Sequence, residues 1–560
     1  MTSIDDLQAR ATALLTQTES SASVEAKVAS TEGPSRRFSP FIPSELDRSI
    51  ALAGELMRIA AEQDVGAALD EAERRTATED VGLVRHAVEM FIVHDPEAAR
   101  LAIPPIPQAD AKRAAAQLAG AIGPESALDW FREDPLANDH HRHWHIVYPA
   151  RGRPTPGGGV RLQDRQGELF FYMHQQMLAR YDAERRGLGF DPVEPFADYR
   201  APIGEGYEDR PGGQALRDVD RDDTGPLQIA DLEDQRDRLQ AAVAAHSVEN
   251  GGGPEALTSE LLGALEEPTA GTLWGDVWHH GFGHVITAFV MAPHGGGEPG
   301  DIGDTATAIR DPFFWRWHRH IDDQNFALQE QAEPFAFDDA PDVTLTDVGL
   351  AFESDPGTPV DELLTMVAET DDVAHGDHEP FLWRLSAENP GSEERKVTVR
   401  IFLAPAEAAD DRRAWIEMDK FEHVLPPGAS EIERPGRLAS PARKPAERPP
   451  VLVQGPANTP HAQYCRCGWP YHLLIPRGTV AGMPCRVLVM LTDWELDRVS
   501  GDDDCGSMSF CGSKDLYPDR REMGYPFSRP IPGGIAATLE ALPSVHARDV
   551  NIRHDPRPPA

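Results

Sequence analysis

The sequence predicts an α+β chain of several domains, in which helical regions come first and an antiparallel β-sandwich comes last. Up to about residue 335, apolar residues recur every three or four positions, as on one face of a helix. From residue 341 onward, short β-branched segments alternate between apolar and polar residues and are separated by Pro and Gly. A length of 560 residues suits about three domains, which we expect at 1–125, 126–340 and 341–560.

The helical prediction begins with the stretch "ELDRSIALAGELMRIAAEQ", residues 45–63, whose apolar residues lie three and four positions apart. The Pro-rich stretch "AIPPIPQAD" (102–110) interrupts this pattern, and the next domain is again mainly helical. Four segments predict strands of the third domain: "DVTLTDVGLAFES", "KVTVRIFLAP", "HLLIPRG" and "CRVLVMLTDW".

Charge and hydropathy exclude two classes of partner. The chain has 93 acidic residues against 53 Lys and Arg, a formal net charge of −40, so a nucleic acid or an anionic membrane surface is not expected to bind it. Its most apolar stretches are too short to span a bilayer, and the N-terminus has no apolar signal segment. We expect a soluble protein, either cytoplasmic or released without a signal.

Histidines form two groups with the same spacing along the sequence. In "NDHHRHWHIVYP" (138–149), His141 and His145 have the i, i+4 spacing that places both side chains on one helix face. His280 and His284 repeat this spacing. About thirty residues after each pair comes a lone histidine in a helix-like segment, His174 after the first and His318 after the second. A helix pair that reverses direction can bring each lone histidine against its pair.

Three neutral imidazoles for each metal ion, without thiolate or carboxylate, suit copper or zinc. The H-E-x-x-H pattern of zinc proteases is absent, and two all-histidine sites together favour a copper pair that binds dioxygen. The imidazole N–H groups are expected to be oriented by carbonyl or carboxylate oxygens. Four further histidines do not fit the spacing and are expected either to support the ligands or to lie at the surface: His140, His143, His279 and His320.

All five cysteines lie between residues 465 and 511. Cys465, Cys467, Cys505 and Cys511 could form two disulfides or a zinc site. A C-x-C spacing is poor for zinc, so two disulfides are favoured, with Cys485 left free.

Long segments of the chain resemble arthropod-type hemocyanins and prophenoloxidases. Around the histidines these are "FREDPLANDHHRHWHIVYPA", "GELFFYMHQQMLARYDAERRGLG" and "DTATAIRDPFFWRWHRHID". The likeness includes "FSPFIPSELDRSIALAGEL" near the start. It continues in "VTVRIFLAP", "YCRCGWPYHLLIPRGTVAGMPCRVLVMLTDWELDRVSG" and "CGSKDLYPDRREMGYPFSRPI". It therefore covers most of the chain, in order.

The resemblance implies a helical first domain, a four-helix dicopper second domain and an immunoglobulin-like β-sandwich. By position, His141, His145 and His174 would bind one copper ion, and His280, His284 and His318 the other. The family's two disulfides would pair Cys465 with Cys505 and Cys467 with Cys511. A homo-oligomer, a dimer or a hexamer, is also implied.

Three further positions take a role only through the resemblance. Phe41, the second Phe of "FSPF", would project over the copper pair and block substrate. Glu298 would hold a water that takes the proton of a phenol. Gly281 stands where the family usually has an asparagine that helps polarise this water, which weakens monophenol hydroxylation more than catechol oxidation.

Together these features predict a latent type-3 dicopper oxidase that uses dioxygen to oxidise o-diphenols to o-quinones and is weak on monophenols. The alternative is a protein that carries or stores dioxygen reversibly, with the same ligands and no turnover. The expected partners are dioxygen and small phenolic molecules.

Overall fold

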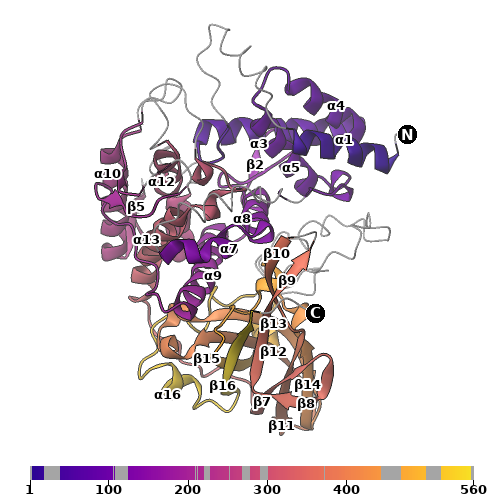
Figure 1. Cartoon of the computed structure of the whole chain (residues 1–560), viewed down its shortest axis with the longest axis vertical. Helices are drawn as coiled ribbons and strands as arrows, with labels where there is room; N and C mark the ends of the chain where they lie inside the picture. Colours follow the sequence, from indigo (N-terminus) through magenta and orange to yellow (C-terminus); the bar gives the residue numbers. More distant parts are fainter. Residues whose placement is uncertain are drawn as a thin grey trace. The chain divides into compact units, whose positions relative to one another are not determined.

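In the computed structural model the chain forms two compact units. Figure 1 labels the helices and strands. The first unit holds residues 1–168, 194–325 and 446–464, and the second holds 169–193, 326–445 and 465–560. The structure describes residues 3–17, 38–104, 106, 124–207, 210, 212–219, 227–250, 252–267, 278–289, 300–370, 373–442, 468–499 and 519–556.

The first unit is helical, as predicted. Its longest helix near the start, α3, covers the expected amphipathic stretch and begins at a proline, whose missing N–H costs a first turn nothing. Asp64, Asp80 and Asp134 cap the following helices by accepting backbone N–H groups. The helices up to the first histidine cluster are α1 (Ile4–Thr16), α3 (Pro43–Glu62), α4 (Val65–Arg75), α5 (Val81–His94), α7 (Asp129–Arg132) and α8 (Pro135–Val147).

The later helices carry the remaining histidines. They are α9 (Gln166–Gly187), α10 (Ile229–Ala245), α11 (Ser259–Glu266), α12 (His279–Ala288) and α13 (Pro312–Gln329). Helix α9 begins in the first unit and continues in the second from residue 169, and α13 passes into the second unit at residue 326. Three short hairpins are β1–β2 (Arg153–Pro154, Val160–Arg161), β3–β4 (Pro202–Ile203, Gln214–Ala215) and β5–β6 (Ser247–Asn250, Gly253–Ala256). Across the described ranges, no helix has an apolar run long enough to cross a membrane.

The second unit contains the β-sandwich. One sheet has the strand order β14 (Gly428–Pro435), β11 (Phe381–Asn389), β7 (Thr344–Phe352) and β8 (Asp355–Val360). The other has the order β10 (Val373–His378), β9 (Glu362–Thr370), β16 (Val545–Asp555), β15 (Met483–Asp493), β12 (Arg395–Pro405) and β13 (Ile416–Leu425). The named strands pair antiparallel except β16 and β9, which run parallel. Two short helices are α15 (Trp494–Asp497) and α16 (Ile535–Leu539).

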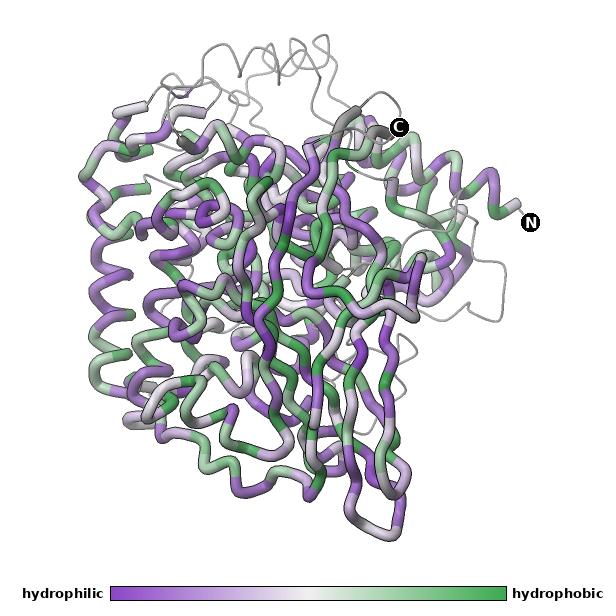
Figure 2. The backbone as a smooth tube through the Cα atoms, turned by 60° about the horizontal axis from the view of Figure 1, so that its bottom comes forward, coloured by the Kyte–Doolittle hydropathy of each residue, from purple (hydrophilic) through white to green (hydrophobic). Residues whose placement is uncertain are grey.

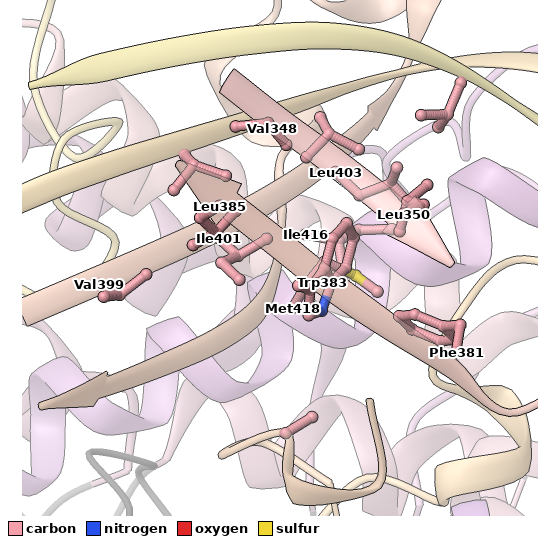
Figure 3. Packing of buried hydrophobic residues seen from close by; sticks show 14 of the residues in the cluster. Val348, Leu350, Phe381, Trp383, Leu385, Val399, Ile401, Leu403, Ile416 and Met418 are labelled. Atoms are coloured by element: carbon pink, nitrogen blue, oxygen red, sulfur yellow. The ribbon is translucent and has the colours of Figure 1, made fainter. Parts of the chain in front are cut away.

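The sandwich core lies between the two sheets. Figure 3 shows Leu350 and Trp383 of one sheet among Ile401 and Met418 of the other, all fully buried or nearly so. Hydrophobic and hydrophilic residues alternate along strands of this unit (Figure 2), as a sheet with one covered face requires. Strand β12 departs from alternation because its second face is also covered, by a cluster that includes Phe527.

The prediction of a strand at "HLLIPRG", residues 472–478, is wrong. The segment instead makes a 3-10 turn, η8 (Tyr471–Leu473), in which the Leu473 and Leu474 N–H groups donate to carbonyls three residues back. Leu473, Leu474 and Ile475 are all buried. Three successive buried side chains cannot come from a strand with one exposed face, since its side chains alternate. The apolar run therefore packs into the core as a turn and not as a strand.

Cys485 is the one free cysteine among the described residues, and it is buried on β15. Burial raises the pKa of its thiol, and the charge of Glu184 adds to this effect. The other four cysteines lie outside the described residues, so their two disulfides remain a prediction.

We expect the Cys485 thiol to be unreactive toward a thiol reagent in the native protein, because both burial and the raised pKa remove the reactive thiolate. In denaturant without reductant, one thiol per chain should react; after reduction, five should. The Cys485→Ala variant should take the first count to zero. Five reactive thiols without reductant would show that no disulfide forms, and rapid native labelling would contradict the buried position.

Candidate metal centre

Five of the six predicted ligands lie together in the first unit. On α8, Nε2 of His141 and Nε2 of His145 are 3.2 Å apart. On α12, Nε2 of His280 and Nε2 of His284 are 3.1 Å apart, and His280 is equally close to Nε2 of His318 on α13. The rings of His145 and His280 are parallel, with centroids 6.4 Å apart. Helix α8 and the pair of α12 and α13 therefore present two groups of ring nitrogens to each other.

The opposite ring nitrogen, Nδ1, is held by backbone carbonyls. His141 donates to the carbonyl of Thr305 and His284 to that of Ile302, both at 2.8 Å. His318 donates to Phe314, one turn back on its own helix, at 2.7 Å. These bonds confirm the expected orientation and place the proton on Nδ1, which leaves the Nε2 lone pair free to bind a metal.

His280 differs because a side-chain carboxyl group, and not a backbone carbonyl, lies beside its Nδ1. Glu267 places one oxygen 2.9 Å from Nδ1 of His280, and both residues are buried. Burial and the neighbouring charge of Glu266 raise the pKa of Glu267 to about 8. A pKa of about 8 keeps Glu267 mostly protonated near neutral pH, so a neutral carboxyl group lies beside His280 in the metal-free protein.

These contacts test whether a metal ion fits. With protons on Nδ1, the Nε2 atoms of His280, His284 and His318 would bring unshared lone pairs within 3.1 Å of His280. Burial lowers the pKa of His284 to about 3 and that of His141 to about 4, so protonation does not relieve this repulsion near neutral pH. A bound cation relieves it. An all-imidazole donor set without thiolate or carboxylate suits copper.

His174 belongs to the part of α9 that lies in the second unit. It is buried, and its Nδ1 donates to the Phe170 carbonyl at 2.8 Å, so it has the same tautomer as His141, His284 and His318. The sandwich holds this helix through three side chains: the Tyr172 hydroxyl donates to Glu417, Gln176 to the Trp415 carbonyl and Arg180 to the Leu474 carbonyl. The backbone around His174 is therefore tied to the strands of its own unit.

Gly283 explains how α12 and α13 come close. A Cβ at this position would lie 2.1 Å from the Trp317 ring, so only glycine lets the indole rest on α12 between His280 and His284. The indole N–H donates to the His280 carbonyl at 3.1 Å. Trp317 thus fills the space between the two helices that carry the second histidine set.

Phe41 lies directly against the histidines. Its ring stacks on His284 with a centroid separation of 3.9 Å and an interplanar angle of 7°, and it makes T-shaped contacts with His145 and His280. The side chain is 2% exposed. Ser39 holds the segment in place by donating its hydroxyl to the Gly303 carbonyl at 2.6 Å. In this conformation the ring covers the histidine rings from one side.

Gly281 faces this segment. A Cβ there would lie 3.0 Å from the Phe41 carbonyl oxygen and 3.0 Å from the Trp278 ring. A larger residue at 281 must therefore displace the Phe41 carbonyl or the Trp278 ring slightly. A substitution here changes the packing of Phe41 as well as the polarity beside the histidines. Glu298, the predicted holder of a water, lies outside the described residues.

The four histidines beside the predicted ligands are not at the surface. His140, His143, His279 and His320 are all buried, so the alternative that placed them there is wrong. Sequence reasoning also missed Glu266, Glu267 and Tyr199, which contact histidines beside or within the predicted ligand sets. The only signal in the sequence concerns the two glutamates, which form an adjacent pair ahead of the adjacent histidines at 279 and 280.

Comparison with known proteins agrees with this geometry. A family model described as hemocyanin, copper containing domain, matches residues 107–324, and one described as hemocyanin, ig-like domain, matches 342–554. The hemocyanin B chain of Aphonopelma sp. is 36% identical over 491 residues, covering 77% of this chain and 75% of that protein. Phenoloxidase subunit 1 of Manduca sexta is 34% identical over 500 residues, covering 78% and 71%. A scorpion hemocyanin structure in its activated state has a TM-score of 0.81 and 29% identity, covering 99% of this chain and 100% of that one. The chain carries two three-histidine groups consistent with a dicopper centre.

Acid should destabilise the metal-free protein. Burial lowers the pKa of His86, His94 and His141 to about 4 and that of His284 and His320 to about 3. Below the unfolded value of about 6.5, the unfolded chain binds protons that the folded chain does not, so stability falls as pH falls. Buried acids oppose this trend, most strongly Glu184 and Glu267, whose pKa values burial raises to about 7 and about 8, but these two are outnumbered by the five histidines with the largest shifts.

We therefore expect the melting temperature of the metal-free protein to fall as the pH is lowered from about 6.5 to about 5, measured by calorimetry at constant ionic strength. The His94→Gln variant keeps a donor for the Ile146 carbonyl but cannot titrate, so its slope should be shallower by about one proton. A melting temperature that rises over this range would contradict the neutral state of these rings.

Proposed function

This chain belongs to the arthropod hemocyanin and phenoloxidase family of type-3 copper proteins, and on that premise we propose a latent diphenol oxidase. It would use dioxygen to oxidise o-diphenols to o-quinones once Phe41 is displaced. One copper ion is assigned to His141, His145 and His174, and the other to His280, His284 and His318. The stack of Phe41 on His284 is the observation that carries the proposal of latency.

When bound, the copper ions supply dioxygen binding and accept the electrons that a diphenol loses. The chain supplies geometry and access. Carbonyl oxygens hold His141, His284 and His318 in one orientation, so their nitrogens need not reorganise when metal enters. The histidine rings are buried away from bulk solvent, and Phe41 excludes any ring-sized molecule from the face it covers. A diatomic gas needs far less room than a phenol.

Gly281 bears on which phenols react. A catechol loses its protons more easily than a monophenol, so it depends less on a polarised water near the metal pair. With glycine at 281, no amide is present to help polarise such a water. Weak monophenol activity is therefore part of the proposal, as is the role of Glu298 in holding the water.

The second candidate is reversible dioxygen binding without turnover. The same contact of Phe41 with His284 favours it, because a ring that never leaves blocks every phenol. Similarity to hemocyanin chains also supports it. The two candidates share their ligands and differ only in access, and either could assemble as a dimer or a hexamer.

Opening access at Phe41 separates the candidates. With copper added in air, Phe41→Leu and Phe41→Ala should raise catechol oxidation roughly tenfold or more, with the alanine variant the faster, while elemental analysis still finds about two copper ions per chain. The near-ultraviolet band of the oxygenated protein must be recorded in parallel, so that loss of copper is not mistaken for loss of access. Deleting a buried aromatic ring costs about 3–5 kcal/mol of stability, which a melting curve must show the fold tolerates.

Phe38 provides the matched control, because it lies in the same segment but contacts His86 and not the predicted ligands. Phe38→Leu should leave catechol oxidation at the level of the parent protein. If the band persists in all variants and catechol is never consumed, the oxidase proposal fails and reversible binding stands. Full turnover by the parent protein would show that Phe41 is no gate.

Substitution at Gly281 tests reaction scope. Gly281→Asn should raise the rate on a monophenol relative to a diphenol in the Phe41→Leu background, if water polarisation limits the reaction. Gly281→Ala introduces the same Cβ beside the Phe41 carbonyl without an amide, so it measures the effect of packing alone. An equal rate ratio in both variants would separate Gly281 from the proton chemistry.

A further inference from the structure

We propose that Tyr199 is a positioning residue for the second histidine set, because its hydroxyl ties α12 to α13 beside the predicted ligands. The inference rests on the proposed dicopper centre. The hydroxyl oxygen lies 2.6 Å from Nε2 of His279 on α12 and 2.8 Å from Nε2 of His320 on α13. The two histidines and the tyrosine are fully buried or nearly so. One hydroxyl thus joins two helices that the sequence places far apart.

The direction of each hydrogen bond follows from the inventory of donors. Nδ1 of His279 donates to a Glu266 oxygen at 2.8 Å, so its Nε2 carries the lone pair that accepts the Tyr199 O–H. The tyrosine oxygen then accepts an N–H from His320. Every donor and acceptor in this series of hydrogen bonds has a partner, with neutral rings and one carboxylate. A metal ion is therefore not needed to explain these contacts.

The positions of the two tied histidines give the network its effect. His279 directly precedes the ligand His280, and His320 follows the ligand His318 by two residues. A tie at these positions limits how far the backbones of α12 and α13 can separate. The Trp317 N–H on the His280 carbonyl is a second polar link between these two helices.

Neighbouring contacts reinforce the tie. The adjacent glutamates at the end of α11 contact the adjacent histidines at the start of α12, Glu266 with His279 and Glu267 with His280. The Trp317 ring packs beside Tyr199 and His279, with centroids 5.7 Å and 5.1 Å away. The Arg236 guanidinium lies over the phenol ring, 4.9 Å from its centroid. The phenol ring therefore has little freedom to move, and its hydroxyl defines the spacing.

Tyr199→Phe is the direct test, because it keeps the ring and removes only the hydroxyl. Two buried imidazole nitrogens then lose their hydrogen-bond partner, which raises the free energy of the folded state. The helices lower it again by shifting to positions where these nitrogens find other partners. To observe each site alone, the substitution is placed in His141→Ala, which disables the first site, and in His284→Ala, which disables the second. Copper(II) affinity is measured by competition with a chelator, and the paramagnetic resonance spectrum of the bound ion is recorded.

We expect Tyr199→Phe to weaken copper(II) binding roughly tenfold to a hundredfold in the His141→Ala background, with a changed spectrum, and to leave the His284→Ala background unchanged. Ser49→Ala is the matched control: it removes a buried hydroxyl that bonds an imidazole, Nδ1 of His86, away from the ligand helices. It should change neither affinity.

Equal loss in both backgrounds with a lowered melting temperature would overturn the proposal in favour of a general structural role. No change in either background would also overturn it. A third metal ion in the parent protein that disappears in Tyr199→Phe would replace the hydrogen-bonded tie with a metal site. If the parent protein binds no copper at all, the proposed function fails first, and this is separately visible.

Discussion

The structure of the metal centre depends on one interaction, the hydrogen bond from the Nδ1–H of an imidazole to a carbonyl oxygen. It determines which nitrogen of each ring carries the proton, and so turns Nε2 of His141, His284 and His318 inward as lone-pair donors. Two of the carbonyls come from the segment around residues 302–305, between α12 and α13. A loop with no predicted role therefore orients predicted ligands of both histidine sets.

The same segment connects the predicted ligands to Phe41. The Gly303 carbonyl accepts the Ser39 hydroxyl, and Ile302, the residue before it, orients His284, on which Phe41 stacks. The backbone that orients the ring of His284 thus also fixes the ring that covers it. Movement of Phe41 and the orientation of His284 are linked through two adjacent peptide groups.

Much of this arrangement could be predicted from the sequence, because it depends on local periodicity. The i, i+4 pairs predicted that His141 lies with His145 and His280 with His284, and the strands β7, β12 and β15 follow from their β-branched runs. Contacts made across distant segments could not be predicted. No pattern reveals that Gly283 makes room for Trp317, or that Glu267 reaches His280. The strand predicted at the apolar run 473–475 is wrong, because periodicity cannot distinguish a buried apolar turn from a short buried strand.

The tryptophans around the ligand helices have a consequence for optical measurement. Trp317 rests on α12 with its indole N–H on the His280 carbonyl, the Trp144 ring lies 4.9 Å from that of His145, and Trp278 packs against Gly281. All three are buried, so their emission is shielded from solvent quenchers. An ion with unpaired electrons quenches an excited indole at such short range. The fluorescence of the chain should therefore report metal occupancy directly, with no dye attached.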